Sequence, residues 1–332
     1  MDTRKVLEMG GGTVLISLPK SWAKKNGIVR GSSVAVEEIS GRRLMVKPIG
    51  EKGTKVEDRE VVIEYPRESL SYVTNDVTGA YLMGSNAIRI DGKRMISRED
   101  RARLKAAVTR LVGLEIVDEN AQGMTMQFLL DPAVLDPEKI VRRMASLIAG
   151  MLRDSAEGAK SDQALLALVG ERDDEVDRLY FLLVRTIRTA TIDPEVAERY
   201  ALEPIECLDY RVLASYLESL GDAIADFSKR ASLENFGKDV SARLVQFLDT
   251  LEKMGDVAIS SFLARRRVQP KRTHTEVAAM RERLGELSKG MVGMKGTSTG
   301  MMVDLLALLE RVASIFVDIS DLALPTYQFR PE

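Results

Sequence analysis

Three carboxylates lie four residues apart in the C-terminal half of the chain: Glu218, Asp222 and Asp226. At about 100° per residue they follow one side of a predicted helix, nearly opposite its apolar stripe. Carboxylates at this spacing repel one another, so the row is unfavourable unless cations neutralise it. Oxygen ligands with no neighbouring Cys or His suit Mg²⁺, Ca²⁺, Mn²⁺ or iron better than zinc or copper. The row indicates a surface metal site, but it is also typical of a solvated helix face.

The helix that carries these acids has a second copy later in the chain. Each apolar residue of its stripe is followed 92 positions later by another apolar residue. The same offset relates Glu218 to Glu310 and Asp226 to Asp318. Ser314 stands where the first copy has Asp222, so the second row lacks one acid. The paired apolar positions are Leu213, Leu217, Leu220, Ile224 and Phe227 in the first copy, and Leu305, Leu309, Val312, Phe316 and Ile319 in the second.

A duplicated three-helix bundle accounts for this repeat and for the residues before it. Asp136-Pro137-Glu138 combines a capping Asp, a first-turn Pro and an early acid, which is a typical helix start. Apolar residues at helical spacing follow within residues 140–151 and 176–187. We therefore predict an all-α domain over residues 136–332, built from two three-helix repeats.

Positive charge gathers at the opposite end of the chain. The whole chain has a formal charge of -2, yet its first 48 residues hold nine Lys and Arg against four acids, a net charge of +5. The remaining residues therefore carry -7. Because a uniformly basic coat is absent, a contact with nucleic acid would have to be made by the N-terminal residues.

A small β-rich module is predicted for residues 1–48. Short strands and tight turns alternate here with one helix of barely two turns. So small a module with exposed strand edges buries little apolar surface alone, so we expect it to dimerise. The predicted elements are a hairpin from Arg4 to Leu18 with a turn at Gly10–Gly12, a helix from Pro19 to Asn26-Gly27, and strands at 34–36 and 44–46 joined by a turn at 40–42.

Residues 49–135 are predicted to connect the two ends. A polar stretch from Ile49 to Glu60 has the composition of a linker, and an α/β unit follows it. We find no chemical constellation in this unit, and Gly84 and Gly113 are typical of turn or packing glycines. Its predicted strands begin or lie at 61–63, 87–90, 114–117 and 124–130, and its predicted helices lie at 68–83 and after a Ser97 cap.

The cysteine and histidine content excludes several classes of site. One cysteine, Cys207, cannot form an internal disulfide, and one histidine, His274, cannot complete a Cys/His zinc cage. We expect Cys207 to be buried and His274 to be solvent-exposed near a helix start. No apolar run is long enough to cross a bilayer, and the first residues lack the apolar core of a secretory signal, so we expect a cytoplasmic protein that does not span a membrane.

The N-terminal residues resemble a known family. Arg4-Lys5-Val6, Gly10-Gly11-Gly12, Ser17-Leu18-Pro19-Lys20, Trp22-Ala23 and Gly27-Ile28 are similar to the AbrB/SpoVT swapped-hairpin DNA-binding domain, over about the first 48 residues. The turn at Gly31-Ser32-Ser33 departs from the Gly-Asp that is common in this family. The resemblance implies a homodimer whose basic residues contact DNA, but the same charges would also solvate a module that only dimerises. The implied DNA contacts are Arg4, Lys5, Lys20, Lys24 and Lys25.

The helical residues resemble the PhoU family, from about Asp136 to Leu324. Tyr216–Ala223 and Leu309–Ser314 are similar to its twice-occurring acidic helix signature, Glu171–Tyr180 to its second helix, and 81–84 with 111–117 to the connecting segment of archaeal PhoU-type regulators. The resemblance implies a surface-bound metal ion, divalent or trivalent (Mg, Mn, Ca or Fe). The implied ligands are Glu218, Asp222 and Asp226 first, and then Glu310, Asp318 and Asp177.

Together these features favour a multidomain, phosphate-responsive transcriptional regulator. Its N-terminal module would bind a DNA operator, and its helical domain would sense metal or phosphate. The alternative is an adaptor that does not bind DNA and regulates a phosphate ABC transporter, or the regulators of that transporter, by protein contact. An enzyme is not expected, because the sequence has no paired nucleophile and base and its acids lie on an open helix surface.

Overall fold

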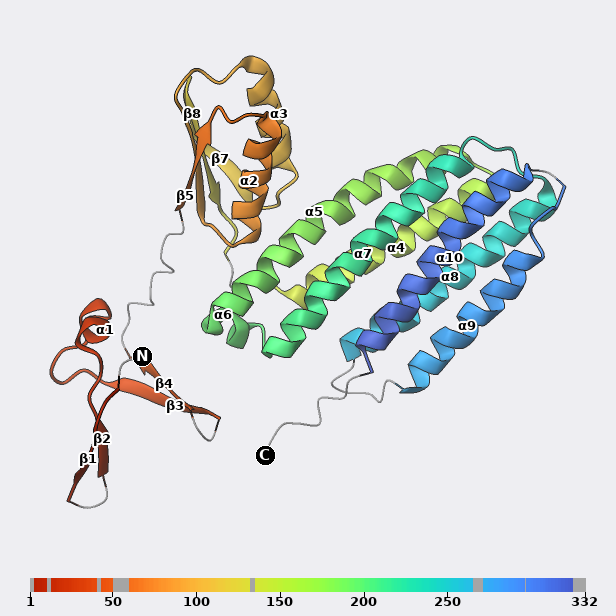
Figure 1. The fold of residues 1–332 in the computed structure, drawn as a ribbon. Coiled ribbons are helices and arrows are strands. Elements are labelled where there is room, and N and C mark those ends of the chain that lie inside the picture. Colours follow the sequence, from red (N-terminus) through yellow and green to blue (C-terminus); the bar gives the residue numbers. More distant parts are fainter. Residues whose placement is uncertain are drawn as a thin grey trace. The chain divides into compact units, whose positions relative to one another are not determined.

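The computed structural model describes residues 3–10, 13–40, 43–49, 60–131, 135–264, 271–295 and 297–324. The chain divides into two compact units, Met1–Arg59 and Glu60–Glu332 (Figure 1). The predicted boundary between residues 135 and 136 lies inside the second unit. The predicted linker, except for its two ends, and parts of the turns at 10–12 and 40–42 lie outside the described residues.

The first unit follows the predicted order of two strands, a short helix and two strands. Both strand pairs are antiparallel hairpins, with Val6 opposite Ile16 in the first and Val36 opposite Val46 in the second. None of its described hydrophobic side chains is buried, and those on the first hairpin are 41–65% exposed. The unit therefore lacks a core of its own within its described residues. Its elements are β1 (Val6–Met9), β2 (Thr13–Ile16), α1 (Lys20–Lys25), β3 (Val34–Ser40) and β4 (Arg43–Pro48).

The second unit begins with the predicted α/β elements, which form one four-stranded sheet. The strand order is β5-β6-β8-β7, with β5 and β6 parallel and the other pairs antiparallel. Both helices cover one face of the sheet (Figure 1), and the Ser97 side chain caps the second helix as predicted. The elements are β5 (Glu60–Tyr65), α2 (Leu70–Leu82), β6 (Ala87–Gly92), α3 (Arg98–Thr109), β7 (Leu114–Glu119) and β8 (Gly123–Phe128).

The predicted helical region forms six long helices that lie side by side, with one short helix between the second and the third of them (Figure 1). All ten apolar positions related by the offset of 92 are completely buried, so the repeat is a repeat of core positions. Asp136 caps the first helix as predicted. The helices are α4 (Pro137–Lys160), α5 (Ala164–Ile192), α6 (Pro194–Arg199), α7 (Pro204–Ala231), α8 (Lys238–Ala264), α9 (Lys271–Lys289) and α10 (Thr299–Leu322).

The structure confirms the prediction for Cys207 and corrects that for His274. Cys207 is buried on α7, and burial raises the pKa of its thiol. His274 lies in the first turn of α9, but its side chain is only 33% exposed, with Nδ1 2.9 Å from Asp321 Oδ1. The prediction was wrong because it considered α9 alone, whereas α10 packs against this turn.

A buried arginine joins the sheet to the helices. Arg185 of α5 donates hydrogen bonds to the carbonyl oxygens of Tyr81 (2.6 Å) and Ser85 (3.0 Å). Its guanidinium also lies 3.8 Å from the centre of the Phe128 ring and 5.0 Å from that of Tyr81, within the range of cation–π attraction. Burial lowers the pKa of Arg185 to about 10, which still leaves it charged at neutral pH. The two parts of the second unit are thus fixed to each other at this point.

We predict that Arg185→Ala lowers the free energy of unfolding by roughly 3 kcal/mol, because it leaves two buried carbonyl groups without a donor and opens a cavity. Arg188→Ala is the matched control. Arg188 lies less than one turn away, and its guanidinium donates a long hydrogen bond to the Met83 sulfur, at 3.8 Å. Its loss should change stability by less than about 0.5 kcal/mol. Urea titration followed by circular dichroism measures both. Equal effects of the two substitutions would contradict this role for Arg185.

Candidate metal site on helices α5 and α7

Two pairs of acids face each other where α5 packs against α7. Asp173 and Asp177 lie one turn apart on α5, and Glu218 and Asp222 lie one turn apart on α7. One carboxylate oxygen each from Asp177, Glu218 and Asp222 lies within 4.8 Å of the other two. Among the residues that the structure describes, no other group of three potential ligands comes this close. We call Asp173, Asp177, Glu218 and Asp222 the acidic cluster.

Asp173 is the member of the cluster that the sequence analysis missed. Its Oδ1 atom is buried and has no hydrogen-bond partner among the described residues. Gly221 makes this position accessible, because a Cβ atom at residue 221 would lie 2.6 Å from that oxygen. A buried carboxylate oxygen without a donor is costly, so the site has an unmet need for a cation or a proton. The signal in the sequence was the four-residue spacing between Asp173 and Asp177. It equals the spacing between Glu218 and Asp222.

The cluster raises the pKa values of its own members. Burial, and then the charges of Asp222 and Asp177, raise the pKa of Asp173 to about 7. Burial and the neighbouring acids also raise the pKa of Glu218. Burial raises that of Asp177, although Arg110 opposes the shift. At neutral pH the site therefore holds negative charge that neither solvent nor protein fully compensates.

The ligands present fit a hard cation. The cluster offers carboxylate oxygens only, which matches Mg²⁺, Ca²⁺, Mn²⁺ or iron and not a zinc or copper site rich in His and Cys. Cys207 is buried elsewhere on α7, and His274 contacts Asp321 and Ser320. The residues that would hold the ion are Asp177, Glu218 and Asp222, with the Asp173 oxygen beside them.

Only part of the predicted ligand set comes together. Asp226 is exposed one turn beyond Asp222 and is outside the group of three. In the second repeat, Glu310 accepts a hydrogen bond from Ser288 Oγ (2.7 Å), and its other oxygen lies 3.8 Å from Arg281 Nη2. Burial and Asp321 raise the pKa of Asp318, which is also outside the group. The second repeat thus places a guanidinium and a hydroxyl against its glutamate.

The predicted DNA-contacting residues belong to the first unit. All five of them have exposed side chains, and none lies in a site that the structure defines. The two lysines at the end of the short helix, Lys24 and Lys25, complement the negative end of its dipole. The remaining three are Arg4, Lys5 and Lys20.

Comparison with known proteins identifies a family domain within the helical region. Residues 141–231 match the PhoU domain family, and this range contains all four residues of the acidic cluster. The chain is also similar to the crystal structure of PhoU from Pseudomonas aeruginosa, with 14% identity and a TM-score of 0.39, over 57% of this chain and 93% of that one. No curated protein matches the chain.

The length and hydropathy of a helix decide whether it could cross a membrane. Within the described ranges, none of them combines the length and the apolar character needed to cross a lipid bilayer. The longest, α5, carries charged residues along its length and packs against α4 and α7.

We predict that, without divalent cations, the contribution of Asp173 to stability falls as pH rises from about 4 through about 7. A raised carboxyl pKa means that the folded protein holds the proton more tightly than the unfolded chain, so the deprotonated form is the less stable one. Asp173→Asn should therefore raise the free energy of unfolding at pH 8 by about 1–2 kcal/mol, after allowance for solvent screening, and by little at pH 4.

Asp226→Asn provides the control for this measurement, because Asp226 is an exposed acid on α7 outside the cluster. It should leave the pH dependence unchanged. Urea titrations of both variants at several pH values measure the effect. A loss of stability at pH 8 in Asp173→Asn would contradict the strained carboxylate described above.

Proposed function

We propose that this chain regulates phosphate uptake by contacting components of the phosphate transport machinery, with a divalent or trivalent cation held by its acidic cluster. The match of residues 141–231 to the PhoU domain is the observation that carries this proposal, because both acid pairs lie within that range. A regulator that acts by contact needs no catalytic group, and the acidic cluster lacks a paired nucleophile and base. This is the adaptor interpretation, which the family match supports better than transcriptional regulation.

The cation would act by joining two helices. Because Asp173 and Asp177 come from α5 and Glu218 and Asp222 from α7, an ion bound among them would neutralise both pairs at once. Such neutralisation removes repulsion across the α5–α7 contact. The geometry of this helix pair would then depend on occupancy of the site, and so would any partner surface formed by the pair.

The first unit would serve as a dimerisation module in this proposal. Six apolar side chains of its first hairpin are 41–65% exposed on strands of only four residues each. Such a surface favours pairing with a second copy, since a hairpin this small is not stable alone. The six side chains are Val6, Leu7, Met9, Val14, Leu15 and Ile16.

Binding to DNA is the second candidate role for this unit. The observation that favours it is the exposure of all five predicted basic contacts within a segment of net charge +5. Lysines that contact phosphates release counterions, so DNA binding by these residues would weaken steeply with salt.

We predict that Glu218→Gln weakens Mn²⁺ binding roughly ten-fold or more, because it removes one charged ligand from a site of few. Glu310→Gln is the matched control, as it stands at the equivalent position of the second repeat but contacts Ser288 and Arg281. Calorimetric titration with Mn²⁺ measures both.

The same two variants test the cellular role. Cells that lack the endogenous chain and express the wild type or Glu310→Gln should restrain radiolabelled phosphate uptake when phosphate is plentiful. Cells that express Glu218→Gln should not. If removal of the chain leaves uptake and its control unchanged, the proposed function is wrong.

For the first unit, we predict that the full-length chain is a dimer in analytical ultracentrifugation and that Leu7→Asp with Ile16→Asp shifts it towards monomer. Gel shift on DNA upstream of its own gene, at 50 and 200 mM salt, tests the second role. A shift that weakens steeply with salt, and that is lost in Lys20→Gln with Lys24→Gln, would favour DNA binding. The absence of a shift at low salt would favour a module that only dimerises.

A further inference from the structure

The guanidinium of Arg110, in the α/β part, contacts the acidic cluster. Arg110, the C-cap residue directly after α3, places Nη2 2.6 Å from Asp177 Oδ2. The Asp177 carboxylate belongs to the group of three potential metal ligands, so the guanidinium and a metal ion would compete for the same oxygens. Arg110 is 57% exposed and Asp177 24% exposed at the side chain, so a more highly charged ion has access to replace it.

The residues that follow Arg110 are linked to Arg185 by hydrogen bonds through Tyr81. The carbonyl oxygen of Val112 accepts a hydrogen bond from the Tyr81 hydroxyl (2.9 Å), and the Tyr81 carbonyl accepts one from Arg185. Asp177 and Arg185 are both on α5, two turns apart, which is about 12 Å along the helix axis. The contacts that hold the α/β part to α5 therefore include a buried one at Arg185 and an exposed one at Asp177.

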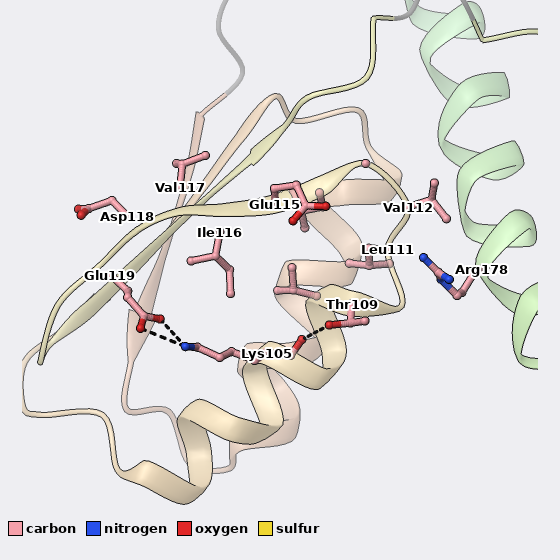
Figure 2. Close-up of a pocket in the computed structure, with 13 residues that line it drawn as sticks. Lys105, Thr109, Leu111, Val112, Glu115, Ile116, Val117, Asp118, Glu119 and Arg178 are labelled. Atoms are coloured by element: carbon pink, nitrogen blue, oxygen red, sulfur yellow. Dashed lines mark hydrogen bonds and ion pairs between the residues drawn. The ribbon is translucent and has the colours of Figure 1, made fainter.

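The surface of the α/β part is hollowed beside the exposed contact. A hollow of about 590 Å³ lies along α3 and β7, and Arg178 of α5 points into it towards Val112 (Figure 2). On its other side, Lys105 Nζ lies 2.9 Å from Glu119 Oε2 within the α/β part itself. Because side chains do not fill this space, the residues after α3 have room to move against α5 when the Arg110–Asp177 ion pair breaks.

We propose that Arg110 is a built-in competitor for the cation site, and that metal binding at the acidic cluster displaces it and frees the residues after α3 from α5. This inference rests on the proposed metal site. Before binding, the guanidinium partly neutralises Asp177; afterwards the ion takes over that role and Arg110 turns to solvent. Cation occupancy is thereby linked to how firmly the α/β part is held, while Arg185 maintains the connection.

Mn²⁺ titration of the full chain, read by the electron paramagnetic resonance signal of free Mn²⁺, tests the competition. Arg110→Gln should bind Mn²⁺ about two- to five-fold more tightly than wild type, the range expected for loss of one exposed competing ion pair. Arg103→Gln is the matched control, because Arg103 forms an exposed ion pair with Glu99 (2.7 Å) on the same helix. It should bind as the wild type does.

Hydrogen exchange of the amides of residues 111–114 provides a second measurement. Saturating Mn²⁺ should speed their exchange in wild type and in Arg103→Gln, whereas Arg110→Gln should exchange fast already and respond little. Equal Mn²⁺ affinity of Arg110→Gln and wild type, or exchange in wild type that Mn²⁺ does not alter, overturns the inference but leaves the metal site standing. Failure of wild type to bind Mn²⁺ at all would overturn both.

Discussion

Repulsion among carboxylates held between two packed helices is the constraint on which this structure depends. The helices α5 and α7 must pack closely, because they share buried apolar stripes, and this packing brings four acids together. Gly221 permits the closest approach, where the Asp173 oxygen lies against α7. Burial, and then the charges of the neighbouring acids, raise the pKa of Asp173 to about 7. Core packing thus creates a site that a cation would relieve.

The two repeats of the bundle place different groups around their equivalent acids. In the first repeat, the acids of α5 and α7 face each other, and the exposed guanidinium of Arg110 pairs with Asp177. In the second repeat, Ser314 replaces an acid, while Ser288 and Arg281 contact Glu310. The paired core positions are apolar and buried in both copies, whereas the groups around the acids differ. Among the residues that the structure describes, the first repeat alone brings three carboxylates together.

Much of this arrangement could be predicted from the sequence. Helical periodicity and the offset of 92 residues are local signals, and they predicted the helical bundle and its core positions. They also singled out Glu218 and Asp222, which the structure places beside Asp177. Asp226 continues the same row, but its side chain is exposed and lies outside the group. Asp173 could have been found from its spacing to Asp177. Arg110 could not, because it meets Asp177 across 67 residues through a tertiary contact with no sequence pattern.

The central claim is that the acidic cluster holds a cation. A crystal structure of the full chain grown with Mn²⁺, with data collected at the manganese absorption edge, tests it most directly. The account predicts an anomalous peak among the oxygens of Asp177, Glu218 and Asp222, with Arg110 withdrawn from Asp177. Absence of a peak there under saturating Mn²⁺, with the Arg110–Asp177 ion pair intact, would contradict the account.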